Sequence, residues 1–389
     1  MYDFENTIDR RATDSIKWSG APNDLPMWIA DMDFKTAPEI QAAMAAKVAQ
    51  GIFGYEEPHA DYFNAVADWY QAEHNAHIDS DWMLFATGVI PAISATVRRV
   101  SNVCDNVVVT APVYNMFYNS IENSGRHVLS SDLQYDRATG HYAIDFADLE
   151  QKLAAPLSTM MILCNPHNPI GRIWTRSELT RIAELCQKYG VTLLSDEIHG
   201  DLRLTETDYT PAFTLPEALI QNLIVCVSPS KTFNVAAMHA ATVIVPNKHL
   251  RNIVNRGLNT DEVAEPNLLA IPGTIAAYTK GHAWLAELRN HLQHNYQLVA
   301  DFCAQSAIPV RLVPADATYL LWLDISDLTD DSATLTKFIH EHTGLQLSSG
   351  DVYRGNGNDF LCINIACPEA MLRDGLHRLA TGLAAFQAQ

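Results

Sequence analysis

The chain has 389 residues, of which 48% are hydrophobic and 18% are charged, so it can form sizeable cores and is not expected to be disordered. At roughly 150 residues per domain, this length predicts two or three domains. Lys and Arg number 26 against 45 for Asp and Glu, a formal net charge of −19, which argues against a nucleic-acid partner. No stretch reaches the ~18 apolar residues of a membrane span.

The cysteines and the N-terminus indicate a cytoplasmic protein. The seven cysteines form no CxxC pair, and several stand inside apolar runs. We therefore expect reduced, mostly buried thiols, with Cys104, Cys186 and Cys303 serving packing. The first residues are polar and acidic, unlike a signal peptide.

The first predicted element is a helix over Pro38–Gln50. A proline stands in its first turn, Ile40, Met44 and Val48 share one face, and Gly51 follows the last turn.

Short apolar runs rich in Val, Ile and Leu follow and alternate with helical patterns. Their length and composition predict strands buried on both faces. The runs are Met83–Ala86, Val107–Thr110, Met160–Cys164, Val191–Ser195, Leu223–Val227 and Thr242–Val245.

The clearest helical pattern between these runs is Thr175–Gly190. Thr175 and Glu178 form a capping box, an apolar stripe follows, and Gly190 ends the helix. Alternation of strands and helices predicts an α/β domain with a mostly parallel sheet between helices. In such sheets ligands bind beyond the carboxyl ends of the strands.

After about Gly281 the pattern changes to that of a smaller α+β domain, which we expect the N-terminal segment to join. A long helix, two short strands and a final helix are predicted at Trp284–Gln305, Tyr319–Leu323, Phe360–Ala366 and Pro368–Phe386. We therefore expect three parts: an N-terminal segment of residues 1–45 associated with the small domain, a large domain of residues 46–281, and a small domain of residues 282–389.

Chemically useful residues follow the first of these strands. Thr87-Gly88-Val89 comes between a strand and a helix, where free backbone N–H groups suit a phosphate. The loop Asn165–Gly171 contains two prolines and a glycine, and such a rigid loop would present the Asn168 side chain in a fixed position. Taken alone, either feature is also compatible with an ordinary structural turn.

The next two strands end in ionisable groups. Asp196 directly follows a buried run, and a carboxylate buried there needs a cationic partner. Lys231 stands in Ser228-Pro229-Ser230-Lys231, and a lysine in such a site can lose its proton and act as a nucleophile. The order of phosphate turn, Asn loop, buried Asp and Ser-x-Ser-Lys along successive strand ends is what makes the set informative.

This set resembles the pyridoxal-phosphate (PLP) enzymes of fold type I, and more narrowly the cystathionine β-lyase-like MalY/PatB subfamily of class I/II aminotransferase relatives. The resemblance covers nearly the whole chain. It rests on Leu25–Phe34 (LPMWIADMDF), Phe53-Gly54-Tyr55, Asp196–Leu202 (DEIHGDL), Ser230–Asn234 (SKTFN) and Ile363–Pro368 (INIACP). It implies a large domain with a mostly parallel seven-stranded sheet between helices, plus a smaller α+β domain.

The resemblance implies a role for each matching cofactor residue. Lys231 would attach PLP covalently and later move the Cα proton. Asp196 would keep the pyridine nitrogen protonated. Asn168 would bond the phenolic oxygen, and Tyr114 would stack on the ring.

The resemblance also implies a phosphate site and a homodimer. Further contacts to the cofactor would come from Ile198 and His199, although His199 could equally support the site from behind. Tyr55 would reach the phosphate bound by the neighbouring subunit, so that two sites form at the interface of a homodimer. The phosphate would be held by Gly88, Val89, Ser228 and Ser230.

The implied reaction is α,β-elimination from an S-substituted L-cysteine such as L-cystathionine, giving a thiol, pyruvate and ammonia. An aminotransferase on the same scaffold is an alternative, because PLP chemistry branches after loss of the Cα proton. A PLP-binding regulatory protein with weak catalysis is a third reading.

The chain departs from the family pattern at the substrate side. The family usually has an arginine for the substrate carboxylate where this chain has Cys362, and tends to have glycine where this chain has Arg354. A thiol cannot replace the charged fork of arginine. We expect Ala30 and Asn168 to contact the substrate and hypothesise that Arg354 partly replaces the missing arginine; the alternative is that Arg354 faces solvent.

Overall fold

The computed structural model describes residues 2–388, so Met1 and Gln389, the outer ends of the predicted terminal parts, lie outside the described residues. Its centre is a seven-stranded sheet in the order β2-β10-β9-β8-β7-β3-β4. Only the pairs that β10 makes with β2 and β9 are antiparallel, which confirms the predicted α/β class. The strands are β2 (Met83–Ala86), β3 (Asn106–Val109), β4 (His127–Ser130), β7 (Ser158–Cys164), β8 (Thr192–Asp196), β9 (Leu223–Val227) and β10 (Ala241–Ile244).

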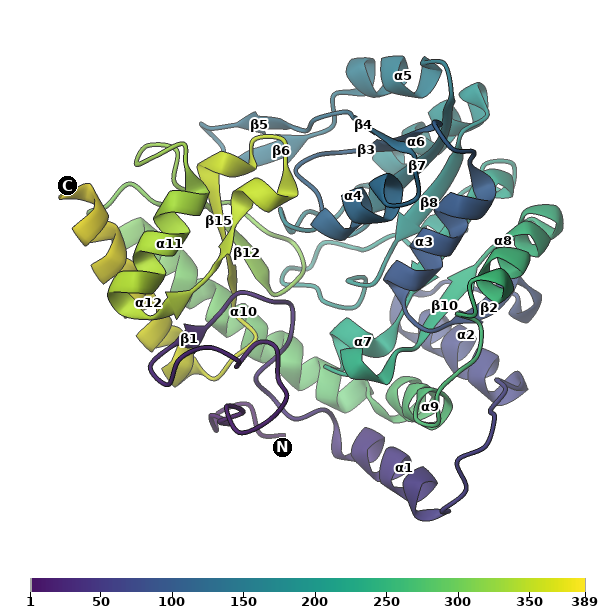
Figure 1. The fold of residues 1–389 in the computed structure, drawn as a ribbon, viewed down its shortest axis with the longest axis horizontal. Helices are drawn as coiled ribbons and strands as arrows, with labels where there is room; N and C mark the ends of the chain where they lie inside the picture. Colours follow the sequence, from purple (N-terminus) through teal and green to yellow (C-terminus); the bar gives the residue numbers. More distant parts are fainter. Residues whose placement is uncertain (1, 389) are drawn as a thin grey trace.

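Helices cover both faces of this sheet (Figure 1), because each central strand is buried on both faces. Val107 and Val109 enter one core and Val108 enters the other, as the period of two in a strand requires. The helices are α1 (Pro38–Ala49), α2 (Ala60–His74), α3 (Val89–Val100), α4 (Asn115–Glu122), α5 (Phe146–Ala154), α6 (Arg176–Tyr189), α7 (Pro229–Thr232), α8 (Lys248–Thr260) and α9 (Ala270–Lys280).

Helix α6 shows how closely local sequence sets the element ends. Thr175 accepts a hydrogen bond from the Glu178 backbone N–H, and the Glu178 carboxylate accepts one from the Thr175 backbone N–H, which completes the predicted capping box. Gly190 then takes a left-handed conformation with φ of 68° and ends the helix.

The C-terminal part contains an antiparallel sheet in the order β11-β12-β15-β14. Its strands and helices are β11 (Arg311–Leu312), β12 (Leu320–Asp324), β14 (Ser348–Ser349), β15 (Phe360–Asn364), α10 (His282–Gln305), α11 (Ser332–Thr343) and α12 (Glu369–Gln387). Near the N-terminus, β1 (Leu25–Pro26) pairs in parallel with β13 (Leu345–Gln346). A separate hairpin is formed by β5 (Gln134–Asp136) and β6 (His141–Ala143). The division into three parts at residues 45 and 281 stays a prediction.

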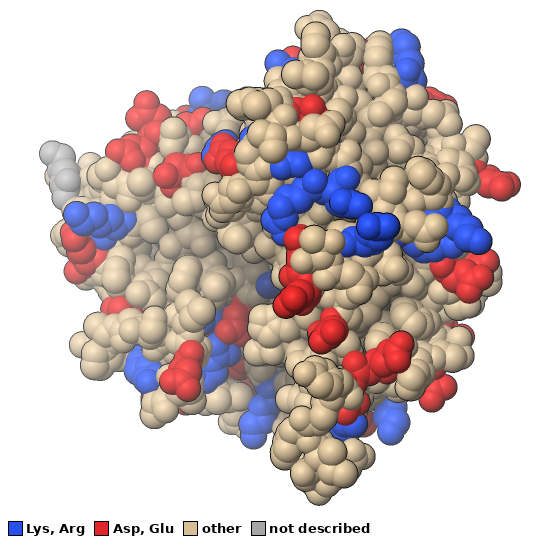
Figure 2. Space-filling view, turned by 45° about the vertical axis from the view of Figure 1, so that its right-hand side comes forward, with Lys and Arg blue, Asp and Glu red and all other residues tan. Residues whose placement is uncertain are grey.

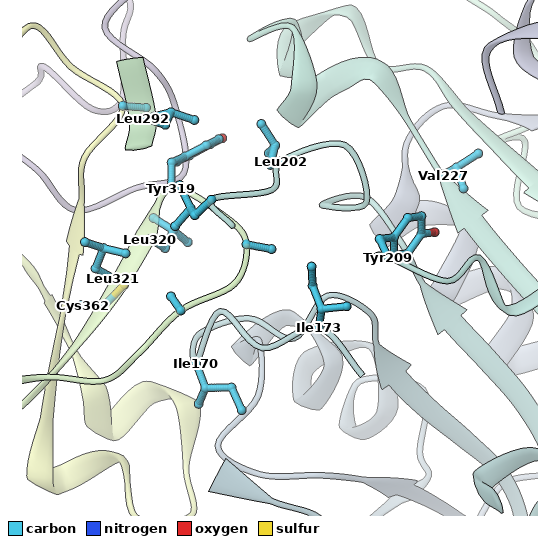
Figure 3. Close-up of a cluster of buried hydrophobic side chains, with 14 of the residues drawn as sticks. Ile170, Ile173, Leu202, Tyr209, Val227, Leu292, Tyr319, Leu320, Leu321 and Cys362 are labelled. Carbon is cyan, nitrogen blue, oxygen red and sulfur yellow. The ribbon is translucent and has the colours of Figure 1, made fainter. Parts of the chain in front are cut away.

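The lobe built on the seven-stranded sheet and the lobe formed by the C-terminal part pack against each other. Figure 3 shows Ile170 and Ile173, from the loop after β7, near Leu202 and the β12 residues Leu320 and Leu321 in one buried cluster. The surface is hollowed between the lobes (Figure 2). Among the described residues, none of the helices combines the length and hydropathy needed to traverse a bilayer.

Residues 27–34, here called the N-terminal strap, are held by buried polar contacts. Lys17 and Asp33 form an ion pair of 2.7 Å in which both side chains are almost fully buried. The Trp18 indole N–H donates to Asp33 at 2.8 Å, and Lys17 Nζ donates to the carbonyl of Asp31 at 2.7 Å. The Asn364 amide donates to strap carbonyls on both sides of Ala30. The strap is thereby fixed against the end of β15.

The cysteines follow the prediction with one exception. All seven are free, and five of them are buried. The expectation that Cys104 serves packing is wrong, because this residue is exposed in a turn with a φ of 71°.

Candidate active site

A pocket of about 370 Å³ combines most of the residues singled out from the sequence. It lies beyond the carboxyl ends of β7, β8 and β9, where ligands of parallel sheets bind. Ten of the predicted site residues line it: Ala30, Gly88, Val89, Tyr114, Asn168, Asp196, Ile198, His199, Ser230 and Lys231.

One end of the pocket is formed by the start of α3. Gly88 caps this helix with a φ of 138°, a conformation that side chains with a Cβ rarely adopt. The first N–H groups of a helix have no acceptor within the helix, and its dipole is positive there. Gly88 and Val89 therefore suit an anionic group such as a phosphate.

Ser228 and Ser230, in the loop after β9, were both predicted to hold the phosphate, but only one of them lines this end of the pocket. Ser230 lines the pocket. Ser228 is not among the lining residues: its hydroxyl accepts from the Ser230 backbone N–H at 3.1 Å and lies 2.7 Å from the Ala240 carbonyl oxygen. The structure thus shows Ser228 capping α7 and holding the loop.

Asp196 provides a buried acidic group at the end of β8. It is 3% exposed, and its carboxylate accepts from the Ile198 backbone N–H at 3.2 Å. Burial raises its pKa from 3.8 to about 7, with Glu197 adding to the effect and Lys231 opposing it. A cation bound in the pocket would restore its charge, and a protonated ring nitrogen is such a cation.

Lys231 provides an amine to the same pocket. Its Nζ donates to the Ala30 carbonyl of the strap at 2.8 Å. Burial lowers its pKa, while Asp31 and Asp196 act in the other direction. A lysine with a lowered pKa has a larger neutral fraction, which is the nucleophilic form.

Two buried polar atoms in the pocket, Oδ1 of Asn168 and Nδ1 of His199, have no hydrogen-bond partner among the residues that the structure describes. Burial lowers the pKa of His199 to about 3, so its imidazole is neutral at pH 7. Burial also raises the pKa of Tyr114 to about 12, which keeps its phenol protonated. Buried polar groups normally have hydrogen-bond partners, so these two atoms without partners indicate a ligand whose polar atoms face them. A pyridine ring carrying a phenolic oxygen and a phosphate fits this set.

Two predicted residues lie elsewhere. Tyr55 is 99% exposed and borders a different cavity of about 740 Å³. Arg354 donates from Nη1 and Nη2 to the two carboxylate oxygens of Glu122 on α4, at 2.8 and 3.0 Å, and its guanidinium lies over the Tyr118 ring. It borders a third cavity with Glu122 and does not line the pocket. The hypothesis that Arg354 replaces the missing substrate arginine is therefore corrected: its charge is already paired away from the pocket.

Sequence reasoning missed several lining residues. The most polar of them, His239, follows a short turn after α7 and has a φ of 50°. Only its position eight residues after Lys231, between β9 and β10, could have suggested it. The others contribute small or apolar surface or the buried Cys164 thiol, and the full set is Thr87, Ile90, Pro91, Cys164, Ala236, His239 and Ala240.

Comparison with known proteins agrees with this geometry. A family model described as "Aminotransferase class I and II" matches residues 26–379. Cystathionine beta-lyase PatB of Bacillus subtilis is 37% identical over 98% of this chain and 99% of its own length. Protein MalY of Escherichia coli is 33% identical over the whole of both chains. The crystal structure of cystalysin from Treponema denticola, which contains pyridoxal 5'-phosphate, superposes with a TM-score of 0.95, with 28% identity over 99% of both chains.

Proposed function

The chain belongs to the aminotransferase class I and II family, and we propose that it is a PLP-dependent carbon–sulfur β-lyase. It would convert S-substituted L-cysteines, such as L-cystathionine, into a thiol, pyruvate and ammonia. The name of its relative PatB and the PLP bound by cystalysin support this reaction and this cofactor. The observation that carries the proposal is the presence of Lys231, Asp196 and Asn168 in one buried pocket.

The pocket residues have separate tasks in this proposal. Bound PLP supplies an electron sink for negative charge at the substrate Cα. Lys231 would hold the cofactor, and its amine would accept the proton from the substrate Cα. The Asp196 carboxylate would keep the proton on the ring nitrogen, and the Asn168 amide would bond the phenolic oxygen. Tyr114 would cover the ring.

The phosphate end is held mainly by backbone. The N–H groups at Gly88 and Val89 would receive the phosphate, and Ser230 would add a hydroxyl. Ser228 keeps this hydroxyl in place by capping α7. Ile198 and His199 line the pocket and would border the ring.

The decisive test is release of pyruvate and free thiol from L-cystathionine by the purified protein without an added 2-oxo acid. Lys231→Ala should lower this rate by at least about 10³-fold, because it removes the proton-transfer group. Arg354→Ala is the matched control, since it removes a cation outside the pocket and should retain the rate. If the wild-type protein releases neither product, the lyase proposal is wrong.

An aminotransferase is the second candidate, because the matching family is named for that reaction. The residues that hold PLP are the same in both cases, so the pocket alone does not separate them. A transaminase would need a 2-oxo acid acceptor and would release no thiol. The same assay, run with and without 2-oxoglutarate, separates the two.

We also propose that the protein is a homodimer, and that it acts in the cytoplasm as the sequence predicts. Figure 1 shows α1 and the segment after it at the edge of the molecule. This region exposes Val48, Ile52, Phe53 and Tyr55, which is unusual for large apolar side chains. A second copy covering them would bring Tyr55 to the phosphate end of its partner's pocket.

Mixing two inactive variants tests the dimer. Lys231→Ala and Tyr55→Phe each disable a different part of the site. If Tyr55 acts across the interface, heterodimers of the two variants contain one intact site and regain activity. If both variants associate but mixing restores nothing, Tyr55 does not act across the interface; a monomer in light scattering would contradict the dimer itself.

A further inference from the structure

The pocket offers no free cation to a substrate carboxylate. Among residues 2–388, its lining contains no arginine, and its lysine is Lys231, which the cofactor would engage. His199 is neutral, because burial lowers its pKa to about 3. His239 stands beside Ala240, next to the loop held by Ser228, and so borders the phosphate end.

The guanidinium groups of Arg10 and Arg354 are already paired with carboxylates. Arg10 is paired with Asp31, with an Nη2–Oδ2 distance of 2.5 Å, and also donates to the Met32 carbonyl at 3.1 Å. Arg354 is paired with Glu122. The strap residue whose charge acts on Lys231 is Asp31. Because Asp31 is paired with Arg10, the strap offers no net positive charge to a carboxylate.

Position 362 forms the layer directly behind the strap. Cys362 and Asn364 are two residues apart on β15 and so point to the same face. Asn364 donates to the carbonyls of Ile29 and Asp31, which flank the lining residue Ala30. Ser348, paired with Cys362 across the sheet, donates to the Trp28 carbonyl at 2.7 Å.

Cys362 itself contributes no charge to this layer. Figure 3 shows its sulfur beside the hydrophobic β12 residue Leu321. It is fully buried, and burial raises its pKa to about 12, so that the thiol is neutral at pH 7. The layer behind the strap is therefore neutral at Cys362, and the strap carries the Arg10–Asp31 ion pair, which has no net charge.

We propose that the pocket does not select for a free α-carboxylate and accepts S-substituted cysteines whose carboxyl group is masked as an amide or ester. This rests on the proposed function, since it concerns the substrate of the same site. A charge-assisted hydrogen bond to a carboxylate favours the free acid by roughly 10- to 100-fold. Without such a bond, the acid loses this advantage and the masked substrate binds as well.

Binding of L-alanine and L-alaninamide to the PLP-loaded wild-type protein tests this directly. Neither has a leaving group at Cβ, so calorimetry measures binding without elimination. Both Kd values are referred to the free-amine form, because the two amines titrate differently. We expect the two Kd values to agree within tenfold. A Kd for the amide more than tenfold weaker overturns the inference and leaves the lyase proposal standing.

The substitution Cys362→Arg provides the converse test. It should create a preference of at least tenfold for L-alanine over the amide, and Cys362→Ser, which adds no charge, should not. If Cys362→Arg folds, as judged by circular dichroism, and shows no such preference, position 362 does not govern carboxylate selection. If it does not fold, the wild-type Kd ratio decides. Failure of both ligands to bind the wild-type protein would instead contradict the proposed function.

Discussion

Replacing Asp196 by Asn should shift the stability of the cofactor-free protein and its affinity for PLP in opposite directions. In the cofactor-free protein, burial raises the Asp196 pKa from 3.8 to about 7. The folded state therefore holds a proton that the unfolded state has lost between these pH values. By linkage, its contribution to stability falls as the pH rises through this window, by up to about 4 kcal/mol.

The Asn variant lacks this loss, because its amide stays neutral at every pH. The increase in stability is partly offset, because Lys231 loses its attraction to the Asp196 charge. We expect cofactor-free Asp196→Asn to be more stable than the wild type by about 1–3 kcal/mol at pH 8 and equal to it near pH 4. With PLP, the variant loses a charged partner of the ring nitrogen, and its affinity should drop by roughly 10- to 100-fold.

Reversible urea unfolding of both cofactor-free proteins at pH 4, 6 and 8 measures the first effect, and equilibrium dialysis against PLP measures the second. The signature is a stability difference that grows with pH. A stability difference that is constant with pH, or a variant less stable than the wild type at pH 8, would show that burial does not raise the pKa of Asp196 as described.

Three further predictions concern other parts of the chain. Lys17→Met should destabilise the protein by about 3–5 kcal/mol in urea unfolding, because Asp33 would remain buried without its cation; a loss below 1 kcal/mol would contradict this. Arg354 has φ of 56° and ψ of −160°, a region that glycine adopts easily, so Arg354→Gly should be about 1 kcal/mol more stable than Arg354→Ala, and neither should change KM for a cysteine conjugate more than twofold. Gly88→Ala should weaken PLP binding at least tenfold by dialysis, because alanine does not readily adopt a φ of 138°; unchanged binding would place the phosphate elsewhere.

Sequence reasoning succeeded where local chemistry decides the structure. The capping box at Thr175 and the strand ends at Asp196 and Lys231 depend on neighbouring residues, so they can be recognised in order. Strand β4 was missed, because His127–Ser130 is an edge strand that carries no run of buried apolar residues. Its pairing with β3 is visible only once the sheet is assembled.

The substrate side was harder to predict, because it depends on contacts between distant segments. Arg354 and Glu122 are 232 residues apart, so no local sequence pattern predicts their ion pair. Whether Tyr55 contributes to a site depends on a second chain, about which local sequence patterns contain no information.

The strap has a consequence for the order in which the protein is made. Ala30 accepts the hydrogen bond of Lys231 and so belongs to the earliest translated part of the pocket. Its neighbour Ile29 is anchored by Asn364, which leaves the ribosome 335 residues later. At about 5–20 residues per second, the strap waits roughly 20–70 seconds for this anchor. The amine of Lys231 thus emerges before one wall of its pocket can be fixed, and capture of the cofactor in its final geometry is a property of the nearly finished chain.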